Sequence, residues 1–179
     1  MSDSGPERVE QRGFYLDELR TGVIYVHRPG RTITEADNVL FTSLTMNNQG
    51  LHLDAAWSAT QPFGQRLVNS LFTLGTMVGQ SVPQMTEGTI VGQLGLDDVK
   101  FPHPMFHGDT LYTETEVLEV RLSASRPGQG IATMKHVGRN QDGTVVATAT
   151  RTCLMWTRDA HRARVGAPTT TAGPTGGED

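Results

Sequence analysis

A long uncharged segment near the middle of the chain limits the possible folds more than any other feature. Residues 67–82 contain no charged side chain. Their apolar residues point to both sides of a helical axis: Leu67, Val68, Leu71, Phe72, Leu74, Met77 and Val78. A helix that is apolar nearly all round has to be buried. We expect Gly75 and Gly79, which share one face, to let this helix approach a sheet closely.

The sequence after this helix has the period of β-strands. Asp142-Gly143 is a strong hairpin signal between two of the runs. The expected strands are residues 89–96, a run that starts at 99–101, and residues 111–122, 130–139 and 145–157. One buried helix followed by a meander of antiparallel strands indicates an α+β fold.

The sequence before the long helix predicts two shorter ones. Thr34 is a good N-cap, and Asp37 lies three residues on, where a carboxylate can reach back to the cap. We expect Leu40, Phe41 and Leu44 to form the apolar stripe of the helix that follows. Asp54 is placed to cap a second short helix.

Length and charge allow one globular domain. The chain has 179 residues with a net charge of −4, which argues against nucleic acid as a partner. Its apolar runs are too short to span a bilayer, so no membrane is expected. We expect a flexible leader (1–12), one domain (13–160) and a disordered tail (161–179). Cys153, the single cysteine, lies in an alternating apolar run and is expected to be buried, which favours a cytoplasmic location.

Three motifs appear in order along the chain. They read NNQGLHLD at 47–54, FGQRLVNS at 63–70 and FPHPMFHGDTL at 101–111. Together they resemble the MaoC-like dehydratases, which include the (R)-specific enoyl-CoA hydratases. The resemblance covers about residues 32–111 and is closest to small itaconyl-CoA or mesaconyl-CoA hydratases. It implies a hot-dog fold, in which an antiparallel sheet wraps around one buried central helix, and a homodimer or higher homo-oligomer.

The resemblance places His52 at the family's catalytic histidine. An imidazole can take and return a proton near neutral pH, which addition of water to a double bond requires. Asn47 stands where the family has its catalytic aspartate, and an amide is not a base. Three accounts are open: His52 moves both protons while Asn47 positions the water, another acid such as Asp37 or Asp109 substitutes, or the chain binds enoyl-CoA without efficient turnover.

The start of the central helix supplies the other expected contacts. Ser70 matches the family's glycine whose backbone N–H faces the thioester carbonyl, and a helix N-terminus suits a developing oxyanion. Asn69 is expected to bind substrate, to cap the helix, or both. Gln49 matches the family's asparagine and is expected to hold the loop or the substrate.

Arg66 replaces a residue that is commonly proline in the simpler hydratases. A guanidinium suits a carboxylate, so we expect Arg66 to recognise the far end of a dicarboxylic acyl chain. The alternative is a surface arginine paired with Asp54 or Glu87. His103 and His107 are expected to line the site or the dimer contact, and no metal is assigned to them because prolines exclude a helix there and no Cys or carboxylate cluster accompanies them.

The function expected from these residues is an enoyl-CoA hydratase or dehydratase. It needs no cofactor, since coenzyme A is part of the substrate. An acyl-CoA thioesterase is a second possibility, but residues 67–85 lack the acidic side chain that often activates water on this helix. A non-catalytic acyl-CoA-binding protein is a third, which Asn47 keeps open.

Overall fold

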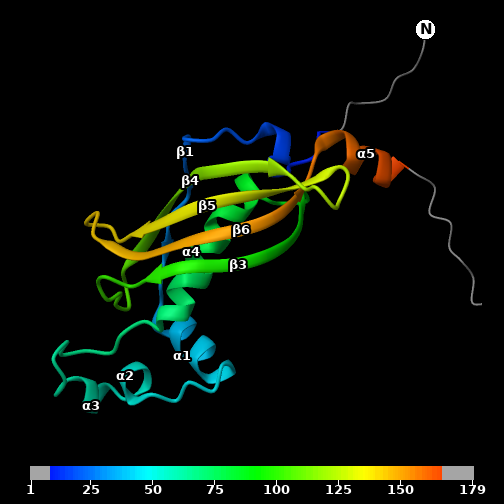
Figure 1. The fold of residues 1–179 in the computed structure, drawn as a ribbon. Coiled ribbons are helices and arrows are strands. Elements are labelled where there is room, and N and C mark those ends of the chain that lie inside the picture. Colours follow the sequence, from blue (N-terminus) through cyan, green and yellow to red (C-terminus); the bar gives the residue numbers. More distant parts are fainter. Residues whose placement is uncertain (1–8, 167–179) are drawn as a thin grey trace, which may run out of the picture.

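The computed structural model describes residues 9–166, with residues 1–8 and 167–179 outside the described part. It has the expected α+β hot-dog fold (Figure 1). The strands are β1 (Ile24–Val26), β2 (Arg31–Thr32), β3 (Ile90–Lys100), β4 (Thr110–Leu122), β5 (Gln129–Arg139) and β6 (Val145–Trp156). The α-helices are α1 (Glu35–Leu44), α2 (Gly50–Leu53), α3 (Ala55–Ser58), α4 (Ser70–Met85) and α5 (Arg158–Gly166). A 3-10 turn covers Leu16–Glu18.

The strands form one antiparallel sheet in the order β1-β4-β5-β6-β3, and β2 pairs separately with β4. The predicted β5–β6 hairpin is confirmed, and Gly143 adopts a positive φ of 80° in its turn. The prediction of two separate runs at 89–96 and 99–101 is wrong, because β3 is one strand. It is interrupted by a register shift between Asp97 and Lys100, where Asp98 has a φ of 52°. Such a bulge bends a strand without ending it.

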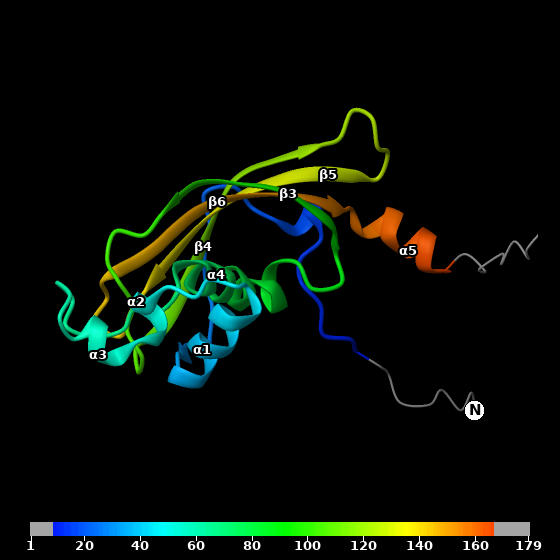
Figure 2. The same ribbon diagram turned by 90° about the horizontal axis from the view of Figure 1, so that it is seen from below.

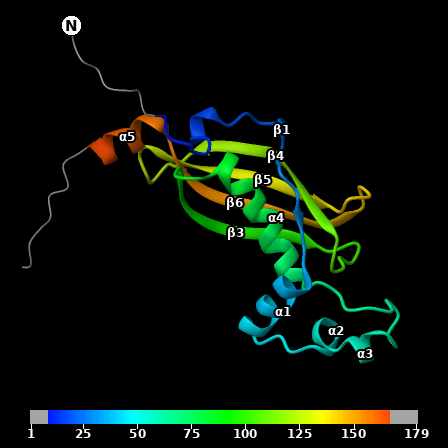
Figure 3. The ribbon, with the colours of Figure 1, turned by 180° about the vertical axis from the view of Figure 1, so that it is seen from behind.

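The long helix α4 lies across the concave face of the sheet (Figure 3). One face is buried, through residues at four-residue intervals: Thr73, Met77, Ser81 and Met85. The helix is thus buried on the face toward the sheet, whereas Leu71 on another face is 58% exposed in the described protomer. The expectation that Gly75 and Gly79 bring the helix onto the sheet is wrong, since an added Cβ at either would meet nothing within 4 Å. Instead they line an open hollow of about 480 Å³ together with Phe41 and Phe72.

A glycine on the sheet allows the close approach instead. A Cβ added to Gly138 of β5 would lie 3.1 Å from Sδ of Met77 and 3.1 Å from Cδ1 of Leu111. Met77 and Leu111 belong to one of two buried clusters between helix and sheet. Cys153 lies in the other and is buried as predicted, and burial raises the pKa of its thiol. Among the described residues, no helix is both long and apolar enough to cross a lipid bilayer.

The short helices α1, α2 and α3 gather near the N-terminal end of α4 (Figure 2). The predicted caps are confirmed: the side chain of Thr34 accepts from the N–H of Asp37, and that of Asp54 accepts from the N–H of Trp57. The predicted orientation of α1 is wrong. Leu40 and Leu44 are 61% and 74% exposed, whereas the buried residues are the polar Asn38 and Thr42.

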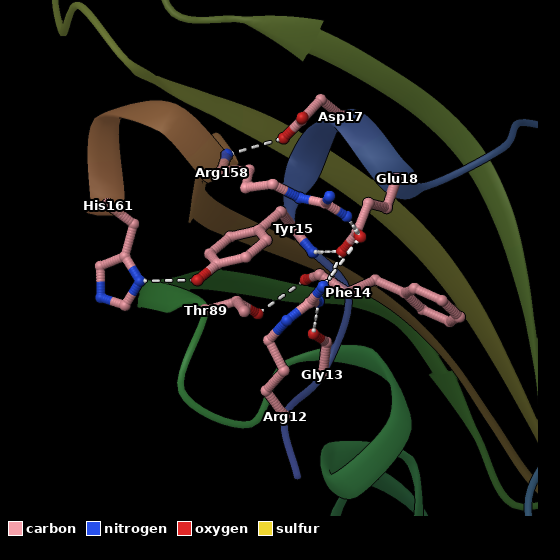
Figure 4. Close-up of polar contacts among 9 residues, drawn as sticks. All are labelled: Arg12, Gly13, Phe14, Tyr15, Asp17, Glu18, Thr89, Arg158 and His161. Carbon is pink, nitrogen blue, oxygen red and sulfur yellow. Dashed lines mark hydrogen bonds and ion pairs between the residues drawn. The ribbon is translucent and has the colours of Figure 1, made fainter. Parts of the chain in front are cut away.

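The two ends of the described chain meet at the opposite end of the sheet (Figure 1), where polar contacts join them (Figure 4). The carboxylate of Glu18 pairs with both Arg12, at 2.6 Å, and Arg158. The hydroxyl of Tyr15 lies 3.1 Å from Nδ1 of His161. Residues 161–166 thus continue α5 and contact the domain, which corrects the expected start of a disordered tail at 161. The remaining tail residues lie outside the described part, as do residues 1–8 of the expected leader.

Candidate active site

His52 is buried at the end of the short helix α2. Its Nδ1 lies 2.9 Å from the backbone oxygen of Leu67. A carbonyl oxygen can only accept, so Nδ1 carries the proton of the neutral ring and Nε2 keeps its lone pair. The peptide N–H of Leu67 also donates to the oxygen of Leu51, at 3.0 Å. The imidazole is therefore fixed on the segment that leads into α4, with Nε2 as the nitrogen that can take up a proton.

The first turn of α4 is built to present backbone N–H groups. Asn69 caps the helix, and its side chain accepts from the N–H of Leu71 at 3.0 Å, which confirms the capping prediction. Ser70 is the first residue of the helix and is exposed. The first N–H groups of a helix lack intrahelical partners and carry a partial positive charge. The side-chain Nδ2 of Asn69 is buried and has no hydrogen-bond partner within residues 9–166.

A pocket of about 450 Å³ opens at this turn. Its walls are mostly apolar, with hydroxyl groups from α4 on one side and the loop before β4 on the other. The lining residues are Phe63, Leu67, Val68, Ser70, Thr73, Phe101, Pro102, His103, Pro104, Met105 and Val146. Because Leu67 both lines the pocket and holds His52, the histidine is one hydrogen bond away from the pocket wall.

Asn38 of α1 is a residue of the site that the sequence analysis missed. It is fully buried, and its side chain bonds to three groups in two segments of the site. Its side chain contacts the oxygen of Leu67 at 3.1 Å, the N–H of Asn69 at 2.7 Å and Nε2 of His107 at 3.0 Å. Asn38 was assigned no role because only its position in a predicted helix, not its partners, could be read from the sequence.

His107 lies near His52 and Arg66. Partial burial, then the positive charge of Arg66 and the nearby His52, lower the pKa of His107 below its ordinary value, while Glu35 acts in the opposite direction. His107 thus joins the site, whereas His103 lines the pocket and its Nδ1 lies 3.0 Å from the oxygen of Val145. No group of three or more His, Cys, Asp or Glu that suits a metal occurs in the described part of the chain.

Arg66 is paired with Glu35, at 2.5 Å, and neither Asp54 nor Glu87 is its partner as the alternative had it. The guanidinium is largely enclosed, with 16% of the side chain exposed, whereas Glu35 is 60% exposed. The hydrogen bond from Arg66, and then its charge, lower the pKa of Glu35. Arg66 is thus already paired with a carboxylate, and that carboxylate is exposed to solvent.

The remaining motif residues are less constrained. Asn47 is half-buried, and its backbone N–H bonds to the oxygen of Thr42 at 3.0 Å, while Gln49 is exposed at the start of α2. Asp37 and Asp109 are engaged in turns. Hydrogen bonds from the backbone and hydroxyl of Thr34 lower the pKa of Asp37, and Asp109 accepts from the N–H of Phe106 at 2.8 Å. This arrangement argues against either as the substitute acid.

Comparison with known proteins agrees with the fold and the motifs. The model of the MaoC like domain matches residues 19–140. Beta-methylmalyl-CoA dehydratase of Chloroflexus aurantiacus is 30% identical over 82% of this chain and 41% of its own length. Mesaconyl-CoA hydratase of Haloarcula marismortui is 26% identical over 83% of this chain and 42% of its own. The chain therefore spans about two fifths of these curated relatives.

A solved structure extends the likeness to a protein of similar size. An unliganded R-hydratase from Pseudomonas aeruginosa superposes with a TM-score of 0.63 and 26% identity, over 81% of this chain and 86% of that one. The family model covers more than half of the chain, and the fold and motif order agree with it. The chain belongs to the MaoC-like domain family.

Proposed function

We propose that the protein is a hydro-lyase that adds water reversibly across the double bond of an enoyl-CoA thioester. The observation that carries this proposal is that the imidazole of His52 and the N-terminus of α4 are joined through one short segment, which begins at Leu67. His52 is bonded to the oxygen of Leu67, and the N-terminus of α4 begins three residues later, at the pocket. A proton acceptor that is bonded to the segment leading into an oxyanion site suits a reaction that passes through an enolate.

In the proposed reaction, Nε2 of His52 takes a proton from water as the water oxygen bonds to the β-carbon. The π electrons move toward the thioester, whose oxygen becomes an enolate facing the N–H groups at Ser70. The enolate then collapses and the α-carbon takes a proton from the imidazolium. Water is thereby added without breaking the thioester, and the reverse sequence is dehydration.

Asn47 receives the role of positioning the water. It lies on the loop between α1 and α2, three residues before the start of α2, which carries His52. An amide both donates and accepts, so it can orient a water molecule without changing its protonation. In this account one imidazole moves both protons, and the engagement of Asp37 and Asp109 in turns supports it over a substitute acid.

For the substrate we propose a branched dicarboxylic acyl-CoA such as itaconyl-CoA or mesaconyl-CoA. The names of two relatives support this choice, since one is a beta-methylmalyl-CoA dehydratase and the other a mesaconyl-CoA hydratase. Arg66 supplies a matching group: its guanidinium is largely enclosed, and its present partner, Glu35, is exposed. The free carboxylate of the substrate would displace Glu35, while Gln49 and Asn69 contact the thioester end.

The thioesterase alternative gains no support from the pocket. None of the side chains that line it in residues 9–166 is a carboxylate that could activate water against the thioester carbonyl. The hydrolytic reading would need such a group, or a nucleophile, beside the carbonyl. Cys153 is unsuitable for that role because it is buried in the core, in a different cluster from the pocket residues Val68 and Met105.

We also propose that two copies of the chain associate as a homodimer. β3 ends the sheet order, so its outer edge is open in the described protomer. Val91, Leu94, Val99 and the neighbouring Phe101 leave apolar side chains exposed along this edge. An open apolar edge is a surface that natural proteins normally cover. Sedimentation analysis should give twice the protomer mass, and a monomer would contradict the proposal.

The function is tested by incubating the purified chain separately with itaconyl-CoA, mesaconyl-CoA and crotonyl-CoA. Mass spectrometry reports addition of water, and a free-thiol assay reports hydrolysis. Water addition without thiol release, lost in a His52 variant, is the expected result. Thiol release without hydration would instead assign the protein to the thioesterases. Binding of enoyl-CoA without turnover would mean that Asn47 marks a lost activity.

A further inference from the structure

The side chain of Asn38 stands at the centre of the hydrogen bonds that assemble the site. It is fully buried on α1, thirty-one residues before Asn69, whose N–H it binds at 2.7 Å. Its other two contacts are the oxygen of Leu67, at 3.1 Å, and Nε2 of His107, at 3.0 Å. One amide therefore joins α1, the entry to α4 and the loop before β4.

The chemistry of the partners fixes which way this amide points. The N–H of Asn69 can only donate, so its partner atom is Oδ1, and the oxygen of Leu67 can only accept, so its partner is Nδ2. The second hydrogen of Nδ2 is then directed to Nε2 of His107. That nitrogen has to accept, which places the ring proton of neutral His107 on Nδ1.

Leu67 connects this amide to the proposed base. Its oxygen accepts from Nδ2 of Asn38 and from Nδ1 of His52 at the same time. We propose that Asn38 is a positioning residue of the site, which holds the 67–69 segment in the register that both His52 and the start of α4 require and which selects the Nδ1-protonated form of His107. The catalytic consequence rests on the proposed function, but the assigned tautomer does not.

The surroundings of His107 agree with this assignment. Protonation of Nε2 would remove the acceptor for Asn38 and place two N–H groups against each other. The ionisable neighbours have opposite effects: Arg66 and His52 disfavour a positive charge on His107, whereas Glu35 favours it. The net effect, led by partial burial, is a lowered pKa for His107, so that a neutral ring with a lone pair at Nε2 persists to lower pH.

The tautomer is tested by long-range ¹H–¹⁵N NMR of the full chain with labelled histidine, with His52→Asn and His107→Gln used for assignment. We expect an unprotonated Nε2 in His107 of the wild type. In Asn38→Asp, a carboxylate oxygen replaces the donor, so Nε2 should gain a proton and the pKa of His107 should rise. A protonated Nε2 in the wild type, or an unchanged His107 in Asn38→Asp, would overturn the proposal.

Kinetics then separate positioning from simple stability. Misplacement of reacting groups by about 1 Å can lower a rate by about 10²-fold, so we expect Asn38→Asp and Asn38→Leu to lower kcat by roughly 10- to 100-fold with a smaller change in KM. Thr42→Val is the matched control, since Thr42 is buried one turn later on α1 and its hydroxyl has no partner within the described chain. It should leave kcat unchanged.

The outcomes are distinguishable. Equal kcat in the Asn38 variants and Thr42→Val would overturn the positioning role. If the wild type hydrates no enoyl-CoA, the proposed function fails, while the wild-type spectrum still decides whether Asn38 sets the tautomer. That spectrum does not depend on the folding of any Asn38 variant.

Discussion

Replacing His52 by asparagine separates its proposed chemical role from its structural one. The amide nitrogen of asparagine takes nearly the place of Nδ1, so His52→Asn can keep the donor to the oxygen of Leu67 that the imidazole supplies at 2.9 Å. It removes Nε2, the proposed base. His52→Ala removes both groups. Comparison of the two variants therefore separates the effect of losing the base from the effect of losing the hydrogen bond to Leu67.

The expected magnitudes differ for activity and stability. Loss of a general base lowers the rate by about 10²- to 10⁴-fold, which corresponds to about 3–5 kcal/mol in the activation barrier. Both variants should show this loss in kcat/KM for the preferred enoyl-CoA. The hydrogen bond to Leu67 adds about 1 kcal/mol of stability, which only His52→Ala forfeits. For a chain of this size, that lowers Tm by about 2–4 °C relative to His52→Asn.

The assay is loss of enoyl absorbance together with thermal unfolding of the same samples. If His52→Asn keeps more than about a tenth of the wild-type kcat/KM, the imidazole is not the proton-transfer group, because even the weakest general base contributes about 10²-fold. If both variants lose activity only in proportion to unfolded protein, His52 has a structural role alone.

Three further predictions follow from the contacts of single residues. Arg66→Ala should lower kcat/KM for mesaconyl-CoA by about 10- to 100-fold, the contribution of one charged hydrogen bond, and leave kcat/KM for crotonyl-CoA nearly unchanged. Glu35→Gln should lower KM for mesaconyl-CoA, and equal losses of Arg66→Ala on both substrates would refute carboxylate selection. Gly138→Ala should destabilise the fold by about 1–3 kcal/mol in urea unfolding, because its Cβ would lie 3.1 Å from Met77 and Leu111. Gly79→Ala, whose Cβ meets nothing within 4 Å, should be neutral or stabilising, and the opposite order of stabilities would contradict the packing of α4 through Gly138. Burial, and then Arg151, lower the pKa of His136 to about 3, so between about pH 6.5 and pH 3 the unfolded state binds more protons than the folded state. The free energy of unfolding should therefore decline by about 1 kcal/mol per pH unit as pH falls through this range. His136→Asn should flatten that decline, and an unchanged slope would exclude His136 as its source.

The elements that depend on local pattern could be predicted from the sequence. The uncharged run and the Asp142-Gly143 turn specified the central helix and the last hairpin, and Thr34 and Asp54 specified two helix starts. These signals lie within a few residues of the structure they determine. The family motifs then specified the hot-dog arrangement.

What failed depends on contacts between distant residues. Asn38 and Thr42, rather than Leu40 and Leu44, form the buried face of α1, because hydrogen bonds to the 67–69 segment satisfy the amide of Asn38. Periodicity favours leucine as the buried residue and contains no information on such partners. The pair of Arg66 with Glu35 spans thirty-one residues and was missed for the same reason.

The glycines illustrate the same limit. Gly75 and Gly79 at helical spacing suggested a close approach, but the contact is made through Gly138 on β5. Which glycine faces the neighbouring element depends on the rotation of α4 against the sheet. That rotation is set by packing of Met77 and the other buried residues of the helix.

The most direct test of the account is the fate of the water oxygen. The purified chain is incubated with mesaconyl-CoA in water enriched in ¹⁸O, and the product is analysed by mass spectrometry before any hydrolysis step. The account predicts one labelled oxygen in an intact CoA thioester, located on the carbon that was β to the carbonyl, and no label in His52→Asn. Label in the carboxylate of a released acid, or an unlabelled thioester, would contradict it.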